Sequence, residues 1–140
     1  MRRKAVVACL AMLAALSAPA SAQRAGARVI ADVPFRFHIG QQIFEAGVYT
    51  FASDKDVLWV AEGNGPAKAG MLTNSFLGTS PVRTGQVVFN CYGQECFLFQ
   101  VRFPERDKGV QMLTSPMETK FQKRRETRVY MALLGKEPKR

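Results

Sequence analysis

The sequence predicts a mainly β protein, in which a single antiparallel meander closes into a small barrel or sandwich and is followed by one C-terminal helix. Three observations predict this fold. Apolar and polar residues alternate through residues 33–51, short apolar runs recur downstream with turn residues between them, and a clear helix start follows only near residue 115. About six or seven strands are expected within residues 33–113, which would form one β domain.

The first 22 residues are predicted to be a signal peptide that is removed, so that the mature chain begins at Gln23. Basic residues 2–4 precede an apolar run, and residues 20–22 supply the small side chains that signal peptidase requires. The run is shorter than the ~20 residues that a membrane-spanning helix needs. The sequence therefore predicts export to the periplasm or the extracellular medium, with no transmembrane helix in the mature chain.

Residues 23–32 are small, polar and basic, and we expect them to form a loose N-terminal arm. The β domain then begins with a strand over residues 35–39, in which three apolar residues share one face. The polar face of this strand carries Arg36 and His38, so we expect His38 to be exposed. A second strand follows within residues 43–51.

Two hairpins are expected further along the chain. Residues 57–61 and 67–73 are apolar runs separated by the turn-forming sequence Glu-Gly-Asn-Gly-Pro. Residues 86–91 and 96–103 form the second hairpin, with Gly93 first in a two-residue turn. Because both faces of this hairpin are apolar, we expect it to be central and covered on both sides.

The same turn fixes the expected position of two cysteines. It places Tyr92 opposite Glu95 and Cys91 opposite Cys96, the latter as a non-hydrogen-bonded pair with Cα atoms ~4.5 Å apart. A disulfide accepts this separation. The third cysteine, Cys9, leaves with the signal peptide, and an even pair in an exported chain favours a disulfide. Two buried free thiols are the alternative.

A helix is expected within residues 114–135. Ser115 is placed to cap its first turn, Pro116 suits the first helical position, and Glu118 completes a capping box. Gly135 is a natural helix stop.

The second half of this segment leaves an alternative open. Arginines interrupt its apolar stripe, so a helix that breaks after Arg125 and gives way to a strand over residues 129–134 competes with a helix that continues to about Leu134. Residues 136–140 are expected to form a frayed basic tail.

The positive charge of the chain is concentrated near its C-terminus. The formal net charge is +9, yet residues 23–119 contain nine basic and nine acidic residues, whereas residues 120–140 contain eight basic and two acidic. The candidate contacts to an anionic surface are Lys120, Lys123, Arg124, Arg125 and Arg128. Outside the cytoplasm such a surface is anionic lipid, lipopolysaccharide or acidic glycan. The alternative is a solvated helix face whose basic side chains cover the sheet.

Nucleic acid is not expected as a partner, because the protein is exported and aromatic residues do not interleave the basic run. A catalytic, metal or cofactor site is not indicated either. His38 is the only histidine, while hydrolytic triads and most zinc sites need a histidine beside other functional groups. Phosphate-binding loops, dinucleotide fingerprints and calcium loops are missing from the sequence. We predict no cofactor and no enzymatic activity, with a histidine-independent hydrolase as an alternative.

Several short motifs occur in a distinctive order: V-P-F-R-F-H-I-G, F-E-A-G-V-Y, V-V-F-N-C-Y-G, C-F-L-F-Q and S-P-M-E. Together they resemble a family of small exported proteins of soil bacteria, whose pattern is V-P-F-x-F-x-x-G, A-G-x-Y, F-x-x-Y-G-x-x-F-L and a terminal S-x-x-E with a basic tail. The resemblance covers most of residues 33–118. It implies a compact β fold and export, and it assigns no activity and no functional residues.

These features favour an exported cell-envelope or extracellular protein with a non-enzymatic binding or structural role. A small β-barrel that binds an apolar ligand is a second alternative, because barrels of about eight strands can enclose one small molecule.

Overall fold

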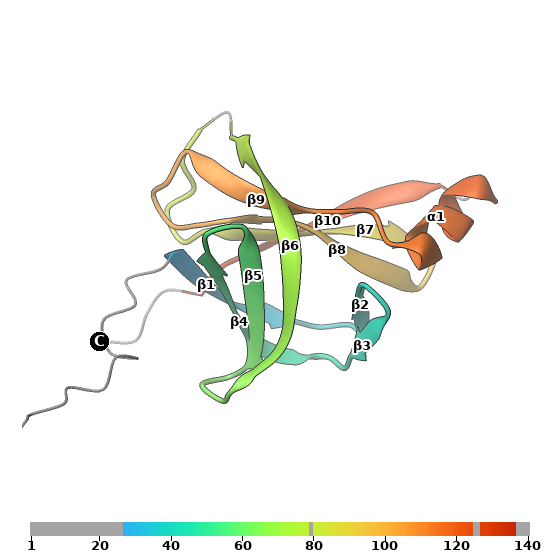
Figure 1. The fold of residues 1–140 in the computed structure, drawn as a ribbon, viewed down its shortest axis with the longest axis horizontal. Helices are drawn as coiled ribbons and strands as arrows, with labels where there is room; N and C mark the ends of the chain where they lie inside the picture. The colour runs from blue at the N-terminus through green and yellow to red at the C-terminus, as the bar shows by residue number, and fades with distance from the viewer. Residues whose placement is uncertain (1–26, 79, 125–126, 137–140) are drawn as a thin grey trace, which may run out of the picture.

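The structure is a computed structural model that describes residues 27–78, 80–124 and 127–136. The predicted signal peptide, Arg125 and residues 137–140 of the predicted tail lie outside the described residues. The predicted mainly β fold is confirmed, since strands dominate the described residues and only one short helix occurs among them (Figure 1).

The described strands belong to one sheet. They are β1 (Ala27–Val33), β2 (Phe37–Ile39), β3 (Gln42–Phe44), β4 (Gly47–Asp54), β5 (Val57–Glu62), β6 (Ala67–Leu77), β7 (Gln86–Tyr92), β8 (Glu95–Arg102), β9 (Lys108–Met112) and β10 (Arg128–Leu134), with the helix α1 (Pro116–Lys123) before β10. The strand order is β1-β4-β5-β6-β9-β8-β2-β3, and β7 lies between β8 and β10.

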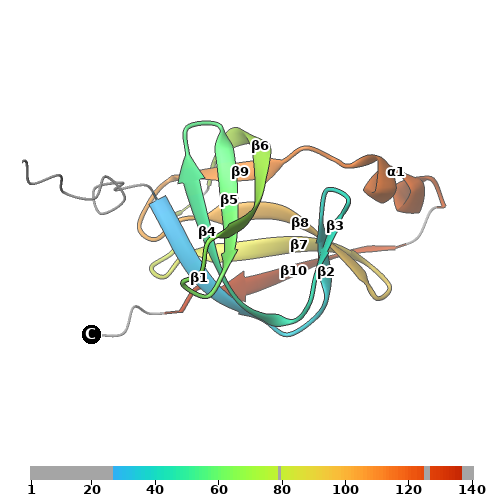
Figure 2. The ribbon, with the colours of Figure 1, turned by 60° about the horizontal axis from the view of Figure 1, so that its bottom comes forward.

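The long strand β6 joins the two halves of the sheet. Its residues 67–72 pair with β5, and its residues 73–77 pair with β9. The half made of β1, β4 and β5 therefore crosses over the half made of β7, β8, β9 and β10 (Figures 1 and 2). The sheet is not closed into a barrel, because β1 pairs with neither of the other two edge strands, β3 and β10, among the described residues.

The core lies between these two halves. Val29, Phe51 and Leu58 contribute to it from β1, β4 and β5, while Phe89 and Val101 contribute from β7 and β8. All five side chains are at most 2% exposed. This placement explains the period-two alternation of the sequence, because each strand presents only one face to the other half.

The expected loose arm over residues 23–32 is wrong for the residues that the structure describes. Ala27–Val33 forms β1, which pairs antiparallel with β4 from Ala27 opposite Ser53 to Val33 opposite Gly47. Alternate residues Val29, Ala31 and Val33 are almost fully buried. The small, basic composition hides this alternation, because Ala31 contributes little apolar surface of its own.

A simple antiparallel meander is also wrong, because β2 pairs parallel with β8, with His38 opposite Phe97. β2 is antiparallel to β3, and the chain turns between them at Gly40, whose φ is 62°. The short β2–β3 hairpin therefore pairs with the start of β8 and does not continue the meander. Nothing local in the sequence encodes this long-range pairing.

The expected helix to Leu134 is wrong, and the alternative of a helix break followed by a strand is confirmed. α1 ends at Lys123, and Arg128–Leu134 forms β10, which pairs antiparallel with β7. β-branched and aromatic residues such as Val129 and Tyr130 favour a strand. The edge of β7 also offers backbone N–H and C=O groups with which residues 128–134 form hydrogen bonds as a strand.

The end of β10 is fixed by a close approach at Gly135, which does not act as a helix stop. A Cβ atom at this position would overlap the carbonyl oxygen of Thr84 and lie 2.5 Å from Cγ2 of Val29. Gly135 N donates to Gly85 O at 3.0 Å, and Lys136 N donates to Ile30 O at 2.7 Å. The last described residues therefore bring the end of β10 against β1.

The start of α1 agrees with its sequence signals. Ser115 has extended backbone angles, and its hydroxyl oxygen accepts a hydrogen bond from Glu118 N at 3.1 Å. Pro116 occupies the first turn as predicted. The reciprocal half of the capping box does not form, because the Glu118 carboxylate turns into the protein instead, as the next subsection describes.

Candidate functional site

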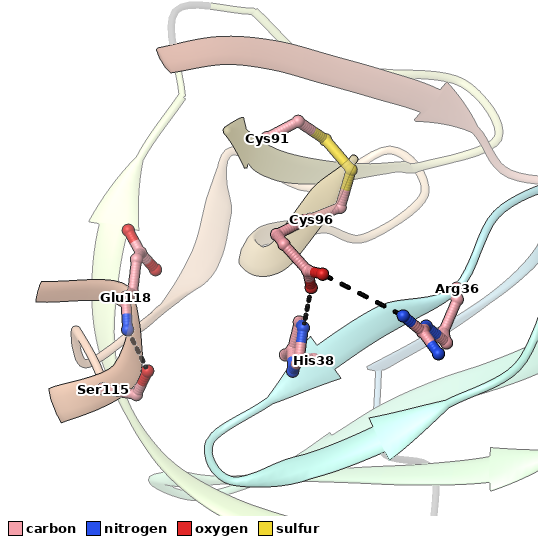
Figure 3. Close-up of polar contacts among 7 residues, drawn as sticks. Arg36, His38, Cys91, Cys96, Ser115 and Glu118 are labelled. Atoms are coloured by element: carbon pink, nitrogen blue, oxygen red, sulfur yellow. Dashed lines mark hydrogen bonds and ion pairs between the residues drawn. A yellow bond between two sulfur atoms is a disulfide. The ribbon is translucent and has the colours of Figure 1, made fainter. Parts of the chain in front are cut away.

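The predicted cysteine pair is brought together across the β7–β8 hairpin. Cys91 lies opposite Cys96 and Tyr92 opposite Glu95, which confirms the predicted register. The Cα atoms of the two cysteines are 4.0 Å apart, and their sulfur atoms lie at disulfide distance (Figure 3). Both cysteines are less than 10% exposed. Turn chemistry at Gly93, whose φ is 63°, is sufficient to explain this geometry.

The same hairpin contains one departure from the expected pattern. A bulge between Val88 and Phe89 shifts the register, so that Phe89 pairs with Leu98 and Val88 with Gln100. Val101 therefore points to the same face as Phe89 and enters the core, whereas simple alternation places it on the opposite face.

Breaking the disulfide is expected to lower stability only modestly. The loop that it closes is short, so replacing both cysteines by alanine should cost roughly 2 kcal/mol of unfolding free energy. Mass spectrometry of the oxidised protein after alkylation in denaturant should show no modified cysteine at Cys91 or Cys96. Two alkylated cysteines without prior reduction would contradict the disulfide.

His38 lies beside this hairpin and is buried, so its expected exposure is wrong. Only 5% of the residue is accessible, because its ring stacks on Phe97 of β8 at a centroid distance of 4.6 Å. Its Nε2 lies 2.5 Å from Oε2 of Glu95, whose other oxygen is 3.9 Å from Nη2 of Arg36 (Figure 3). The parallel pairing of β2 with β8 produces this cluster.

His38 lines a very small cavity, and its second ring nitrogen, Nδ1, is buried without a hydrogen-bond partner in the described part of the chain. The cavity has a volume of about 10 Å³, and His38, Ser115 and Glu118 are among its lining residues. This space suits roughly one water molecule and leaves no room for a substrate between His38 and the Ser115 hydroxyl.

A second polar cluster forms where α1 packs against β7. The Glu118 residue is 5% exposed, and its Oε2 accepts hydrogen bonds from Asn90 Nδ2 at 3.2 Å, Tyr92 OH at 3.0 Å and Gln122 Nε2 at 3.3 Å. Phe121 covers Tyr92, with a centroid distance of 6.0 Å. The carboxylate thus fastens the helix to the sheet through several neutral donors.

Burial raises the pKa of Tyr92, and the neighbouring Glu118 carboxylate adds to this effect. Burial likewise raises the pKa of Tyr49, with a further contribution from Glu62.

An unfolded tyrosine ionises near pH ~10, while the folded protein holds these protons more tightly, so stability is expected to fall as the pH rises above about 10. Urea denaturation at increasing pH should show this fall, with a shallower slope for Tyr92→Phe. Identical slopes would contradict the assignment.

A surface hollow lies next to the disulfide. It has a volume of about 720 Å³ and is open to solvent. Its lining residues are Phe35, Arg36, Glu45, Cys91, Gly93, Gln94, Cys96, Val129 and Met131. The segment before β2 and the edge strand β10 thus form its two sides, with the end of the β7–β8 hairpin between them.

Four of the five predicted anionic-surface contacts belong to α1, to its C-cap and to the start of β10, which form one end of the molecule (Figures 1 and 2), and the fifth, Arg125, lies outside the described residues. Lys120, Lys123, Arg124 and Arg128 are all exposed. The described carboxylates form no ion pair with any of these four side chains. The Arg124 guanidinium lies 5.5 Å from the Phe121 ring centre, and that of Arg128 lies 4.8 Å from the Tyr130 ring centre.

Sequence reasoning missed Glu95, Glu118 and the hollow. Glu95 is visible in the sequence only as a turn residue, and Glu118 only as part of a capping box. Their roles depend on the β2–β8 pairing and on the way α1 packs on β7, which no local pattern reveals.

Within the described residues, groups of three or more potential metal-binding histidine, cysteine, aspartate or glutamate side chains are not found. In the same residues, no helix has both the length and the apolar character needed to cross a membrane. Comparison of the chain with models of protein families, with curated proteins and with solved structures gives no match. The resemblance drawn from the short motifs therefore stays a prediction.

Proposed function

We propose that the protein is exported and has a non-enzymatic binding role, in which its α1–β10 end attaches to anionic surfaces of the cell envelope. We define the α1–β10 end as the exposed basic residues Lys120, Lys123, Arg124 and Arg128 together with Val129 and Tyr130. The observation that carries the proposal is the exposure of four neighbouring basic side chains without ion-pair partners among the described residues.

Two properties of the α1–β10 end indicate that its basic side chains bind a surface. The alternative is that they are only solvated and cover the sheet. Phe121 and Tyr130 lie against Arg124 and Arg128, so these guanidinium groups are held over rings at the surface instead of covering the sheet. Val129 and Tyr130 are 51% and 54% exposed, which adds apolar area beside the charges. Basic and apolar side chains side by side are typical of proteins that bind at a membrane interface.

Export is supported by the cysteine pair. Cys91 and Cys96 lie at disulfide distance, and disulfides persist in oxidising compartments beyond the cytoplasmic membrane. The signal-peptide prediction for residues 1–22 agrees with this compartment. Periplasm and extracellular medium are both compatible with the pair.

The experiment uses residues 23–140 and vesicles of phosphatidylglycerol mixed with phosphatidylcholine. The test variant replaces Lys120, Lys123, Arg124 and Arg128 by glutamine. Each lost charge is expected to weaken binding by about 1 kcal/mol. Substitutions are preferable to removing residues 120–140, because that truncation would delete β10 from the sheet.

A matched control removes the same number of charges elsewhere. Its substitutions are Arg28→Gln, Lys55→Gln, Arg106→Gln and Lys108→Gln, all at exposed positions outside the α1–β10 end. Binding of the control should stay close to that of the unmodified chain. If both variants lost vesicle binding equally, binding would depend only on the net charge of the protein. If both retained it equally, the α1–β10 end would have no role in binding.

An apolar ligand enclosed inside the fold is less well supported. The cavity beside His38 measures only about 10 Å³, far below the several hundred Å³ typical of ligand pockets. The larger apolar hollow lies at the surface beside β10.

A further inference from the structure

β10 lies at an edge of the described sheet. Among the described strands it pairs only with β7. Beyond Leu134 the chain turns onto its neighbours, where Gly135 and Lys136 donate to Gly85 and Ile30. The open part of the edge is therefore the stretch of residues 128–132, where backbone groups that point away from β7 have no partner in any described strand.

This open stretch lacks the protection that natural edge strands usually have. Proline, bulges and inward-pointing charges commonly block an edge, yet residues 128–132 contain a single charge, at Arg128. Apolar side chains are exposed on both faces: Val129 at 51% and Met131 at 40% on one, and Tyr130 at 54% on the other. An exposed apolar strand of this kind is a site for association.

The hollow of about 720 Å³ runs beside the same strand and is lined on that side by Val129 and Met131. A lipid or a small apolar molecule could fill the hollow, but its hydrocarbon could not satisfy the backbone groups of the edge. An added β-strand does both, since its backbone continues the sheet and its alternate side chains enter the hollow.

We propose that β10 pairs antiparallel with β10 of a second copy of this chain, about a twofold axis at Tyr130. In this register Tyr130 lies opposite Tyr130 of the second copy, and Val129 lies opposite its Met131. Arg128 lies opposite Ala132 of the second copy. Aromatic and apolar cross-strand pairs of this type stabilise antiparallel sheets.

Charge favours a second copy in this orientation. Antiparallel pairing places the two Arg128 side chains four residues apart along the strands, roughly 13 Å, which exceeds the Debye length of ~8 Å at physiological salt. Each α1 helix then lies at an opposite end of the paired strands. Parallel pairing would instead bring both basic ends together.

The rim of the hollow argues against an acidic peptide as the occupant. Glu45 lines the hollow, and the other charged lining residue, Arg36, already lies 3.9 Å from Glu95. The uncharged segment of residues 129–132 of a second copy meets no such repulsion.

Sedimentation equilibrium of residues 23–140 over a wide concentration range tests the proposal. A reversible dimer is expected, and Met131→Lys should raise its dissociation constant at least about tenfold, because it places a charge in the paired interface. Leu72→Lys, on an exposed position of β6 that is 64% accessible, should leave the constant unchanged. Circular dichroism confirms that both variants remain folded.

Cross-linking tests the register. Tyr130→Cys lies on the proposed twofold axis and should form a disulfide-linked dimer under mild oxidation, whereas Leu72→Cys should not. A monomer at all concentrations, a dimer insensitive to Met131→Lys, or equal cross-linking of both cysteine variants would overturn the proposal. Vesicle binding by Met131→Lys is a separate readout, since this variant keeps the four basic residues of the α1–β10 end.

Discussion

Replacing Phe37 by alanine is expected to lower the unfolding free energy by about 3–5 kcal/mol. Phe37 is fully buried, and its ring contacts Phe44 at 5.4 Å, Tyr49 at 5.1 Å and Phe89 at 5.2 Å between ring centres. Because these residues lie on β3, β4 and β7, the Phe37 ring joins both halves of the sheet. The cavity left by alanine cannot be filled without moving several strands.

Urea denaturation measures this effect, with Leu72→Ala as the control. Leu72 is 64% exposed on β6, so its truncation should change stability by no more than about 0.5 kcal/mol. Similar losses in the two variants would mean that the aromatic cluster around Phe37 does not hold the halves together.

Replacing Glu118 by alanine is expected to lower the unfolding free energy by about 2–4 kcal/mol. The substitution leaves Asn90 Nδ2 and Tyr92 OH without their acceptor, and both residues are at most 4% exposed. An unsatisfied buried donor costs about 1–3 kcal/mol. The loss should also release α1 from β7, because Glu118 is the helix residue that contacts both donors.

Glu118→Gln is the matched variant, because its amide oxygen can accept from the same donors. Only the advantage of a charged acceptor is lost, so the cost should be about half that of alanine or less. Hydrogen exchange of the α1 amides should accelerate in Glu118→Ala and remain near normal in Glu118→Gln. Equal destabilisation by both variants would show that the negative charge itself is essential.

Local patterns were sufficient for much of the fold. The period-two alternation of apolar residues predicts the strands, Gly93 predicts the β7–β8 turn and the register of Cys91 with Cys96, and Ser115 with Pro116 predicts the start of α1. Each of these features depends on residues that are close together in the chain, so each can be derived from backbone preferences.

Features that depend on distant residues could not be derived. The parallel β2–β8 pairing buries His38 and places it beside Glu95, 57 positions away in the sequence. β10 forms because its residues pair with the edge of β7, and this pairing is favoured over continuing the helix that begins at Pro116. The candidate site shows the same division: the basic residues were predicted individually, whereas the surrounding apolar strand and hollow arise from the fold.

The most direct test of the account is the salt dependence of vesicle binding by residues 23–140. Raising the ionic strength from about 0.01 M to about 1 M shortens the Debye length from ~30 Å to ~3 Å. Binding to phosphatidylglycerol vesicles through Lys120, Lys123, Arg124 and Arg128 should be strong at low salt and should largely disappear at high salt. Binding that is absent at low salt, or equally strong at both, would contradict the proposed attachment through the α1–β10 end.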